Sequence, residues 1–162
     1  MRMAGEVTMK DLLRTIPQIG EVVAMTIRPE RKMDPIYVEK VEAVAGSGLS
    51  GDHFAAKSIK REVTLIQAEH LNVVEELLSR EVPLHMTRRN IMVKGINLLA
   101  LKGQQFTIGD AVFEGTGECY PCSRMEANFG PGGYNAMRGH GGLTAKIIQS
   151  GTIKPGDKVA LI

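Results

Sequence analysis

Both cysteines of the chain lie in one short stretch, Glu118-Cys119-Tyr120-Pro121-Cys122-Ser123-Arg124. Ten of the 18 glycines lie at position 115 or later, so the backbone around this stretch can approach a ligand closely. A thiol followed by a basic residue in such a segment is held in an electropositive setting, which favours the thiolate, the form that acts as nucleophile and metal ligand. The stretch therefore predicts chemistry at a cysteine.

The residues alone leave several readings of this stretch open. Cys119 and Cys122 have the C-x-x-C spacing of dithiol redox sites. That motif normally opens a helix within a β-α-β unit, whereas here a hairpin precedes it and Pro121 stands directly before the second cysteine. A zinc site would use Cys119, Cys122, His140 and either His53 or His85, which is half of a recognisable zinc signature. Alternatively, both cysteines are small buried side chains.

Two further groups of polar residues are candidates for ligand binding. Arg88, Arg89 and Asn90 precede a predicted strand, and guanidinium groups offer a rigid fork of donors to phosphate oxygens; a solvated charge cluster is the alternative. Asp52 and His53 follow a G-x-G-x-x-G match at 46–51. The long helix of a dinucleotide site does not follow, so we expect a tight loop in which this pair handles protons, orients a ligand or pins the loop.

The elements that position these residues are mostly short strands. We expect strands at 21–27, 36–45, 62–67, 91–94, 106–108, 111–114, 143–149 and 158–162, and one clear helix at 68–80. Gly109-Asp110 joins two alternating runs and suits a hairpin turn, and residues 136–143 read as a loop. The fold class predicted from this pattern is mainly β: an antiparallel-rich β-barrel with a few peripheral helices.

The first residues have a different pattern. Met9, Leu12, Leu13 and Ile16 recur at helical spacing, which predicts a short amphipathic helix within 1–16. We therefore divide the chain into an N-terminal helical extension, 1–18, and one domain, 19–162. The helix either packs on the domain or serves association, for example as a dimer contact.

Composition limits the function classes. The net charge of +2 is spread along 162 residues, which argues against a nucleic-acid partner, as do the 4% aromatic content and the absence of Trp. No apolar run is long enough for a membrane span. Two cysteines this close together cannot form the disulfide framework of a small secreted protein. A cytoplasmic protein with no membrane or nucleic-acid contact is expected.

From Ile19 to Ile162 the order of motifs resembles the MOSC domain, the C-terminal domain of molybdenum cofactor sulfurase, which also occurs in small stand-alone bacterial proteins. The matching motifs are Gly51-Asp52-His53, Arg61 before a strand at 63–66, Arg89-Asn90-Ile91, Leu101-x-Gly103, Phe106-x-Ile108-Gly109, Pro121-Cys122, Gly141-Gly142-Leu143 and Gly151-x-Ile153-x-x-Gly156-Asp157. Their order and spacing over nearly the whole chain carry the resemblance.

The resemblance implies a β-barrel that binds the pterin-based molybdenum cofactor (molybdopterin), with Cys122 as molybdenum ligand or as persulfide carrier in sulfur transfer. It implies cofactor-binding roles for Asp52, His53, Arg61, Arg88, Arg89, Asn90 and Arg124. Some family members take part in reducing N-hydroxylated compounds.

The chain differs from larger members because it lacks the pyridoxal-phosphate desulfurase domain. We therefore expect no pyridoxal phosphate on this chain and expect a cysteine desulfurase or an electron-transfer protein as partner. Whether the protein is an enzyme or a non-catalytic carrier stays open at this point.

Overall fold

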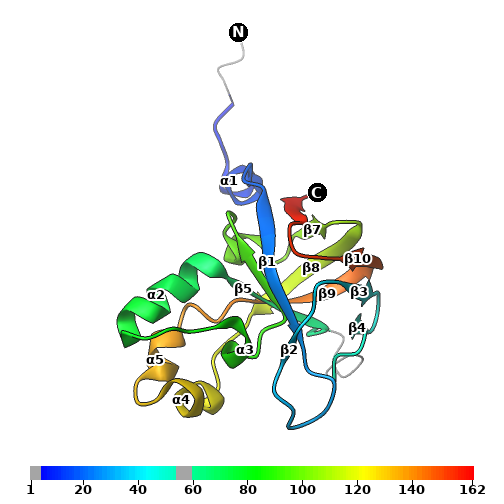
Figure 1. Cartoon of the computed structure of the whole chain (residues 1–162). Coiled ribbons are helices and arrows are strands. Elements are labelled where there is room, and N and C mark those ends of the chain that lie inside the picture. Colours follow the sequence, from blue (N-terminus) through cyan, green and yellow to red (C-terminus); the bar gives the residue numbers. More distant parts are fainter. Residues whose placement is uncertain (1–4, 54–59) are drawn as a thin grey trace.

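The protein is a closed barrel of seven strands, seen in a computed structural model that describes residues 5–53 and 60–162 (Figure 1). The strands are β1 (Gly20–Ile27), β5 (Val63–Gln67), β6 (Ile91–Lys94), β7 (Gln105–Ile108), β8 (Ala111–Glu118), β9 (Leu143–Gln149) and β11 (Lys158–Leu161). Around the barrel the order is β1-β11-β7-β8-β9-β5-β6, and β6 closes onto β1. Only the β5–β6 pair in this ring is parallel. The predicted mainly β, antiparallel-rich barrel is confirmed.

A smaller sheet lies beside the barrel. It contains β3 (Val41–Val44), β4 (Gly48–Leu49) and β10 (Gly151–Ile153), while β2 (Ile36–Tyr37) pairs with β1. The strand predicted at 36–45 is therefore two strands. The glycine stretch at 46–51 contains the end of the β3–β4 turn, β4 itself and the turn that follows, and Gly46 and Gly51 adopt positive φ angles in these two turns.

The helices gather on one side of the barrel (Figure 1). They are α2 (Ala68–Leu78), α3 (Leu84–Thr87), α4 (Ser123–Phe129) and α5 (Gly133–Met137), with a 3₁₀ turn η1 at Leu98–Leu101. α2 and α3 form the crossover that the parallel β5–β6 pair requires. Residues 136–143 are predicted from the sequence to form a loop. This is correct only in part, because α5 continues to Met137.

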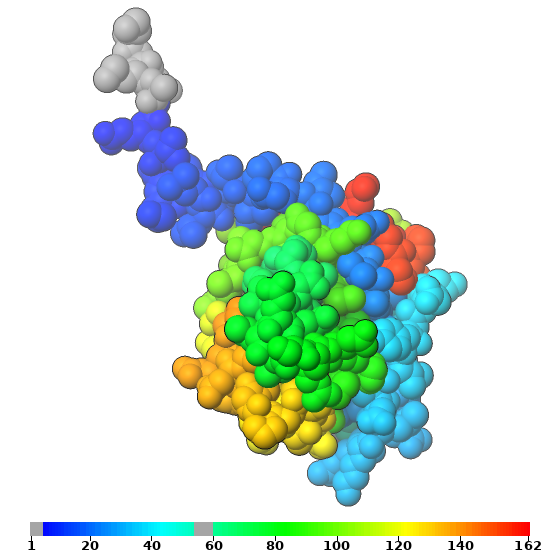
Figure 2. Space-filling view, turned by 60° about the vertical axis from the view of Figure 1, so that its left-hand side comes forward, coloured from blue at the N-terminus to red at the C-terminus, as the bar shows by residue number. Residues whose placement is uncertain are grey.

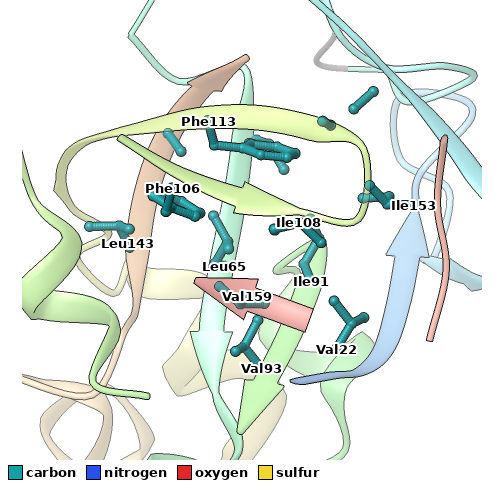
Figure 3. Close-up of a cluster of buried hydrophobic side chains, with 14 of the residues drawn as sticks. Val22, Leu65, Ile91, Val93, Phe106, Ile108, Phe113, Leu143, Ile153 and Val159 are labelled. Carbon is teal, nitrogen blue, oxygen red and sulfur yellow. The ribbon is translucent and has the colours of Figure 1, made fainter. Parts of the chain in front are cut away.

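Two apolar clusters hold the fold together. The first fills the barrel, where Phe106 and Phe113 stack with centroids 5.7 Å apart among strand side chains such as Leu65 and Val159 (Figure 3). The second lies between the helices and the outside of the barrel. It consists of Ile66, Leu71, Val74, Val82, Leu84, Met125, Phe129, Ala136 and Met137. This second cluster fixes α4 and α5, and with them the segment that carries the cysteines.

The N-terminal helix α1 (Met9–Arg14) extends away from the barrel (Figures 1 and 2). It begins at a capping box in which Thr8 and Asp11 bond each other, and the Thr8 side chain is the main cause that lowers the pKa of Asp11. No residue of α1 is buried. Ile16, which follows the helix, packs against the barrel core. The predicted helix is confirmed over 9–14; residues 1–4 lie outside the described part, and the boundary at 18/19 stays a prediction.

Deleting residues 1–15 is expected to change the free energy of unfolding by less than about 1 kcal/mol, because residues 5–15 are all exposed and bury little apolar surface against the barrel. The measurement is urea unfolding of the two forms, with size-exclusion chromatography to report any change in association. A control deletion through residue 22, which removes buried Val22, should be strongly destabilising. Equal, large losses in both deletions would show that α1 belongs to the folding unit.

Candidate functional site

The two cysteines occupy different environments at the junction between β8 and α4. Cys119 is 2% exposed, whereas Cys122 is exposed and has extended backbone as the residue that precedes the first turn of α4. No turn folds the segment 119–122 back on itself. The C-x-x-C motif does open a helix, which the sequence did not indicate, but one thiol points into the protein and the other is accessible at the surface.

A buried arginine holds this segment in place. Arg89 is 3% exposed and donates three hydrogen bonds to carbonyl oxygens: Nε to Gly141 (2.8 Å), Nη1 to Thr87 (3.2 Å) and Nη2 to Tyr120 (3.2 Å). Gly141 packs so tightly that an added Cβ would lie 2.0 Å from the carbonyl oxygen of Cys119. The Arg89 side chain thus joins α3 to the cysteine segment and to the chain before β9.

The pKa of Arg89 is affected by burial, by both cysteines and by a second arginine. The pKa of the Arg89 guanidinium is lowered, and burial is the largest cause. Cys119 and Cys122 raise this pKa in part, whereas the positive charge of Arg61 lowers it further. The guanidinium is therefore within electrostatic range of both thiols and of a second arginine. The cofactor-binding role expected of Arg89 stays a prediction, with three of its five N–H donors already bonded to the backbone.

Most of the other predicted cofactor residues line one cleft of about 390 Å³, which we call the anion cleft. Its walls are Thr26, Ile27, Arg28, Pro35, Asp52, Arg61, Glu62, Val63, Thr64, Arg88 and Asn90. Four of the predicted residues, Asp52, Arg61, Arg88 and Asn90, meet there. The volume is typical of small-ligand sites.

Two of these residues also build the cleft itself. The Asp52 carboxylate accepts a hydrogen bond from the backbone N–H of Arg28 (2.8 Å). His53 N–H donates to the carbonyl of Arg28 (2.6 Å), so the turn at 52–53 is fastened to the end of β1. Asn90 Oδ1 accepts from Thr64 N–H (3.1 Å) while its amide donates to the Thr26 carbonyl (3.2 Å). Asp52 and Asn90 therefore align the strands that surround the cleft.

Three arginines give the cleft its positive charge. Arg28 is 6% exposed, Arg88 is half-buried and Arg61 is exposed. Burial lowers the pKa of Arg28, Asp52 opposes that shift, and Arg124 in the first turn of α4 lowers it further. The carboxylate of Glu62, which also lines the cleft, accepts a hydrogen bond from the backbone N–H of Ile147 (2.7 Å). An anionic group in the cleft would offset the charge of these arginines.

Sequence reasoning missed Arg28. It ends a strand pattern next to Pro29, and nothing in its neighbours distinguishes it from a solvated basic residue. The signal is tertiary: β1 carries Arg28 to the same cleft as Arg61 and Arg88, which are distant in the chain.

A second cleft, of about 540 Å³, shares no lining residue with the anion cleft. We call it the tyrosine cleft. Its walls are Gln67, His70, Leu98, Leu99, Glu118, Cys119, Tyr120, Pro121, Tyr134, Arg138, Gly139, Gly141 and Gly142. Cys122 lines neither cleft, whereas the residues just before it line the tyrosine cleft.

The structure does not support the zinc site considered above, because no three His, Cys, Asp or Glu side chains converge within residues 5–53 and 60–162. His140 instead contacts His70 edge to face (5.4 Å), and its Nδ1 lies 3.0 Å from the Ala136 carbonyl oxygen. His85 lies against Tyr37, with Nδ1 3.2 Å from the phenol oxygen. In the part of the chain that the structure describes, no helix has the length and apolar character needed to cross a bilayer.

The protein combines a closed seven-strand barrel with an exposed cysteine and an arginine-lined cleft. The family model "MOSC domain" matches residues 48–160, more than two thirds of the chain. The chain belongs to the MOSC domain family. The residues that the sequence singled out, from Asp52 to Arg124, all fall within this match.

Solved structures share the fold. The YuaD protein of Bacillus subtilis is 15% identical, with 91% of this chain and 98% of that chain covered and a TM-score of 0.78. YiiM of Geobacillus stearothermophilus is 18% identical (88% and 75% covered, TM-score 0.74), and YiiM of Escherichia coli is 16% identical (88% and 69% covered, TM-score 0.67). No curated protein sequence matches the chain significantly.

Proposed function

We propose that this protein binds the molybdenum cofactor, with the anion cleft taking the cofactor's phosphate and Cys122 serving as the thiolate ligand to molybdenum. The observation that carries the proposal is the convergence of Arg28, Arg61 and Arg88 in one cleft. Arg124, in the first turn of the helix that begins after the exposed Cys122, acts electrostatically on Arg28 of this cleft. Membership of the MOSC family, which is typically associated with this cofactor, supports it.

The residues present fit such a ligand. Guanidinium groups match phosphate oxygens better than any other side chain, and a buried arginine such as Arg28 gains most from a neighbouring anion. An exposed thiolate is a soft ligand suited to a metal in a sulfur-rich environment. The zinc-type cluster that would compete for the cysteines is not found among the described residues.

The chain's own residues then divide the work. Arg28, Arg61 and Arg88 would bind and orient the phosphate end, while Asp52 and Asn90 keep the cleft in shape. Arg89 would fix the segment that presents Cys122, and Arg124 would add positive charge next to the cleft. His53 is placed on the same turn as Asp52 and would handle protons or orient the ligand. When bound, the cofactor would supply redox-active molybdenum.

The finer activity has two candidate forms. In the first, the loaded protein reduces N-hydroxylated compounds with electrons from a partner protein, as the family resemblance suggests. In the second, it is a non-catalytic carrier that receives sulfur as a persulfide on Cys122 from a cysteine desulfurase. The exposure of Cys122 favours access by such a partner. Turnover of an N-hydroxylated test compound by the loaded protein separates the two.

The first experiment is metal analysis of protein purified from cells that make the cofactor, together with the fluorescence of oxidised pterin released on denaturation. Molybdenum and pterin in equal amounts are the expected result. Protein from cells unable to make the cofactor is the control. Purified protein with neither component, even after incubation with free cofactor, would overturn the proposal.

Arg88→Gln is expected to weaken cofactor binding by roughly 1.5–3 kcal/mol, because a charged hydrogen-bond donor to the phosphate is lost. The matched control is Arg31→Gln, which changes an exposed arginine that does not line the anion cleft. Both variants are titrated with phosphorylated and dephosphorylated pterin. An equal loss for both ligands would mean that Arg88 does not bind the phosphate.

A further inference from the structure

The tyrosine cleft shares no lining residue with the anion cleft, and its walls come from several elements. The cysteine segment, α5, the start of α2 and η1 all contribute, and the second apolar cluster fixes α2 and α5 against the barrel. A cleft of about 540 Å³ is in the range of specific small-molecule sites. It is therefore a built cleft rather than a gap between mobile segments.

Two tyrosines line this cleft. The chain has three tyrosines and no Trp, and two of the tyrosines, Tyr120 and Tyr134, line it. They are 72% and 40% exposed, so part of each side chain is accessible to a ligand. Exposed aromatic rings in a cleft favour a planar partner, because stacking adds to the apolar area that is buried.

Both tyrosines are held by acidic residues. Tyr120 Oη donates to Glu118 Oε2 (3.0 Å), which is why the pKa of the phenol is raised. Glu126 accepts from the backbone N–H groups of Gly132 (2.6 Å) and Tyr134 (3.1 Å), which fixes the start of α5. The Tyr120 hydroxyl and the backbone of Tyr134 are thus both held by hydrogen bonds to carboxylates.

The cleft has a cationic side chain that an anion could pair with. Arg138 follows α5, lines the cleft and is exposed, with Nη1 3.4 Å from Asn135 Oδ1. The acidic side chain of the cleft, Glu118, already accepts the Tyr120 hydroxyl. His70 contributes a ring nitrogen to the cleft. The pKa of His70 is lowered, mainly by burial and then by His140, whereas Glu69 acts to raise it. The lowered pKa of His70 favours its neutral ring, and Arg138 is the cation of the cleft.

Glycines leave one wall as bare backbone. Gly139 has φ +81° with no atom within 4 Å of an added Cβ, so it borders open space. Gly142 has φ +98°, and an added Cβ would lie 1.9 Å from the Leu65 carbonyl oxygen. A flat ligand can therefore approach the main chain at 139 closely, while the chain at 142 is fixed against β5.

We propose that the tyrosine cleft is a second ligand site, separate from the anion cleft, and that it binds a small planar aromatic or heteroaromatic carboxylate. The ring packs against Tyr120 and Tyr134, and the carboxylate pairs with Arg138. This site does not require the cofactor, so it stands whether or not the anion cleft binds a phosphate.

The test is a titration of the full chain with three probes of similar size: benzoate, benzamide and cyclohexanecarboxylate. Amide chemical shifts in ¹H–¹⁵N spectra report the binding position. Benzoate is expected to shift the amides of Tyr134, Arg138 and Gly139 and to bind about threefold to tenfold more tightly than either of the other probes. No shifts at these amides over the millimolar range, or equal binding of all three probes, would overturn the proposal.

Two variants and two controls locate the contacts. Arg138→Gln should remove the preference for benzoate over benzamide, and Tyr134→Leu should remove the preference for benzoate over cyclohexanecarboxylate. Tyr37→Leu and Arg31→Gln change exposed residues of the same types that do not line the cleft, and both should bind like the parent. Circular dichroism confirms that each variant is folded. Benzoate binding that is lost in Arg88→Gln and kept in Arg138→Gln would place the anion in the other cleft and refute this one.

Discussion

Replacing Arg89 by methionine is expected to lower the free energy of unfolding by about 3 kcal/mol or more. Methionine fills most of the space but donates no hydrogen bond, so carbonyl oxygens of Thr87, Tyr120 and Gly141 lose their partner in a largely buried place. Each buried polar group left unsatisfied costs on the order of 1–3 kcal/mol. Urea unfolding followed by circular dichroism measures the loss.

The matched control is the neighbouring residue. Arg88→Met removes a half-buried arginine of the anion cleft and should change stability by less than about 1 kcal/mol. Arg89→Lys should remain substantially destabilised, because one ammonium group cannot reproduce the three directions of the guanidinium. If Arg89→Met instead unfolds like the parent and loses only cofactor binding, Arg89 acts as a ligand donor, as the sequence suggested, and not as the support of the cysteine segment.

The barrel could be predicted because its signal is local. Alternation of apolar and polar residues marks β8 and β9, and Gly109-Asp110 marks the hairpin turn between β7 and β8, where Gly109 has φ +55°. These features depend on neighbouring residues in the chain. They can therefore be recognised in the sequence before the fold is known.

The helices α4 and α5 could not be predicted in the same way. They have seven and five residues, and glycines at 130, 132 and 133 interrupt the segment. Helices this short are not stable through propensity alone. They form here because Met125, Phe129 and Met137 pack on α2 and the outer face of β5, contacts between residues far apart in sequence.

The candidate site shows the same limit. Arg88 and Arg89 are adjacent and look equivalent in the sequence, yet the left-handed backbone of Arg88 (φ 60°) places it on the anion cleft while Arg89 is buried. The motif could indicate that arginines matter at this position. Which of the two faces a ligand depends on how α3 ends.

The largest functional effect is expected at Cys122. Cys122→Ser should reduce molybdenum retention, persulfide formation and any reductase activity to background, because a serine hydroxyl supplies neither a soft anionic ligand nor a comparable nucleophile. The residue is exposed, so the substitution should leave stability nearly unchanged. Metal analysis and thiol-trapping mass spectrometry of the purified variant measure the losses.

Cys119 provides the matched control, since it is the other thiol of the same segment but is 2% exposed. Cys119→Ala should keep most of the molybdenum and persulfide and cost about 1 kcal/mol of stability, because a small buried group is removed. Alanine is preferable to serine here, since an unpartnered buried hydroxyl would add a separate penalty. A dithiol or a shared metal site requires both thiols, so comparable functional losses in the two variants, with both proteins folded, would contradict the assignment to Cys122 alone.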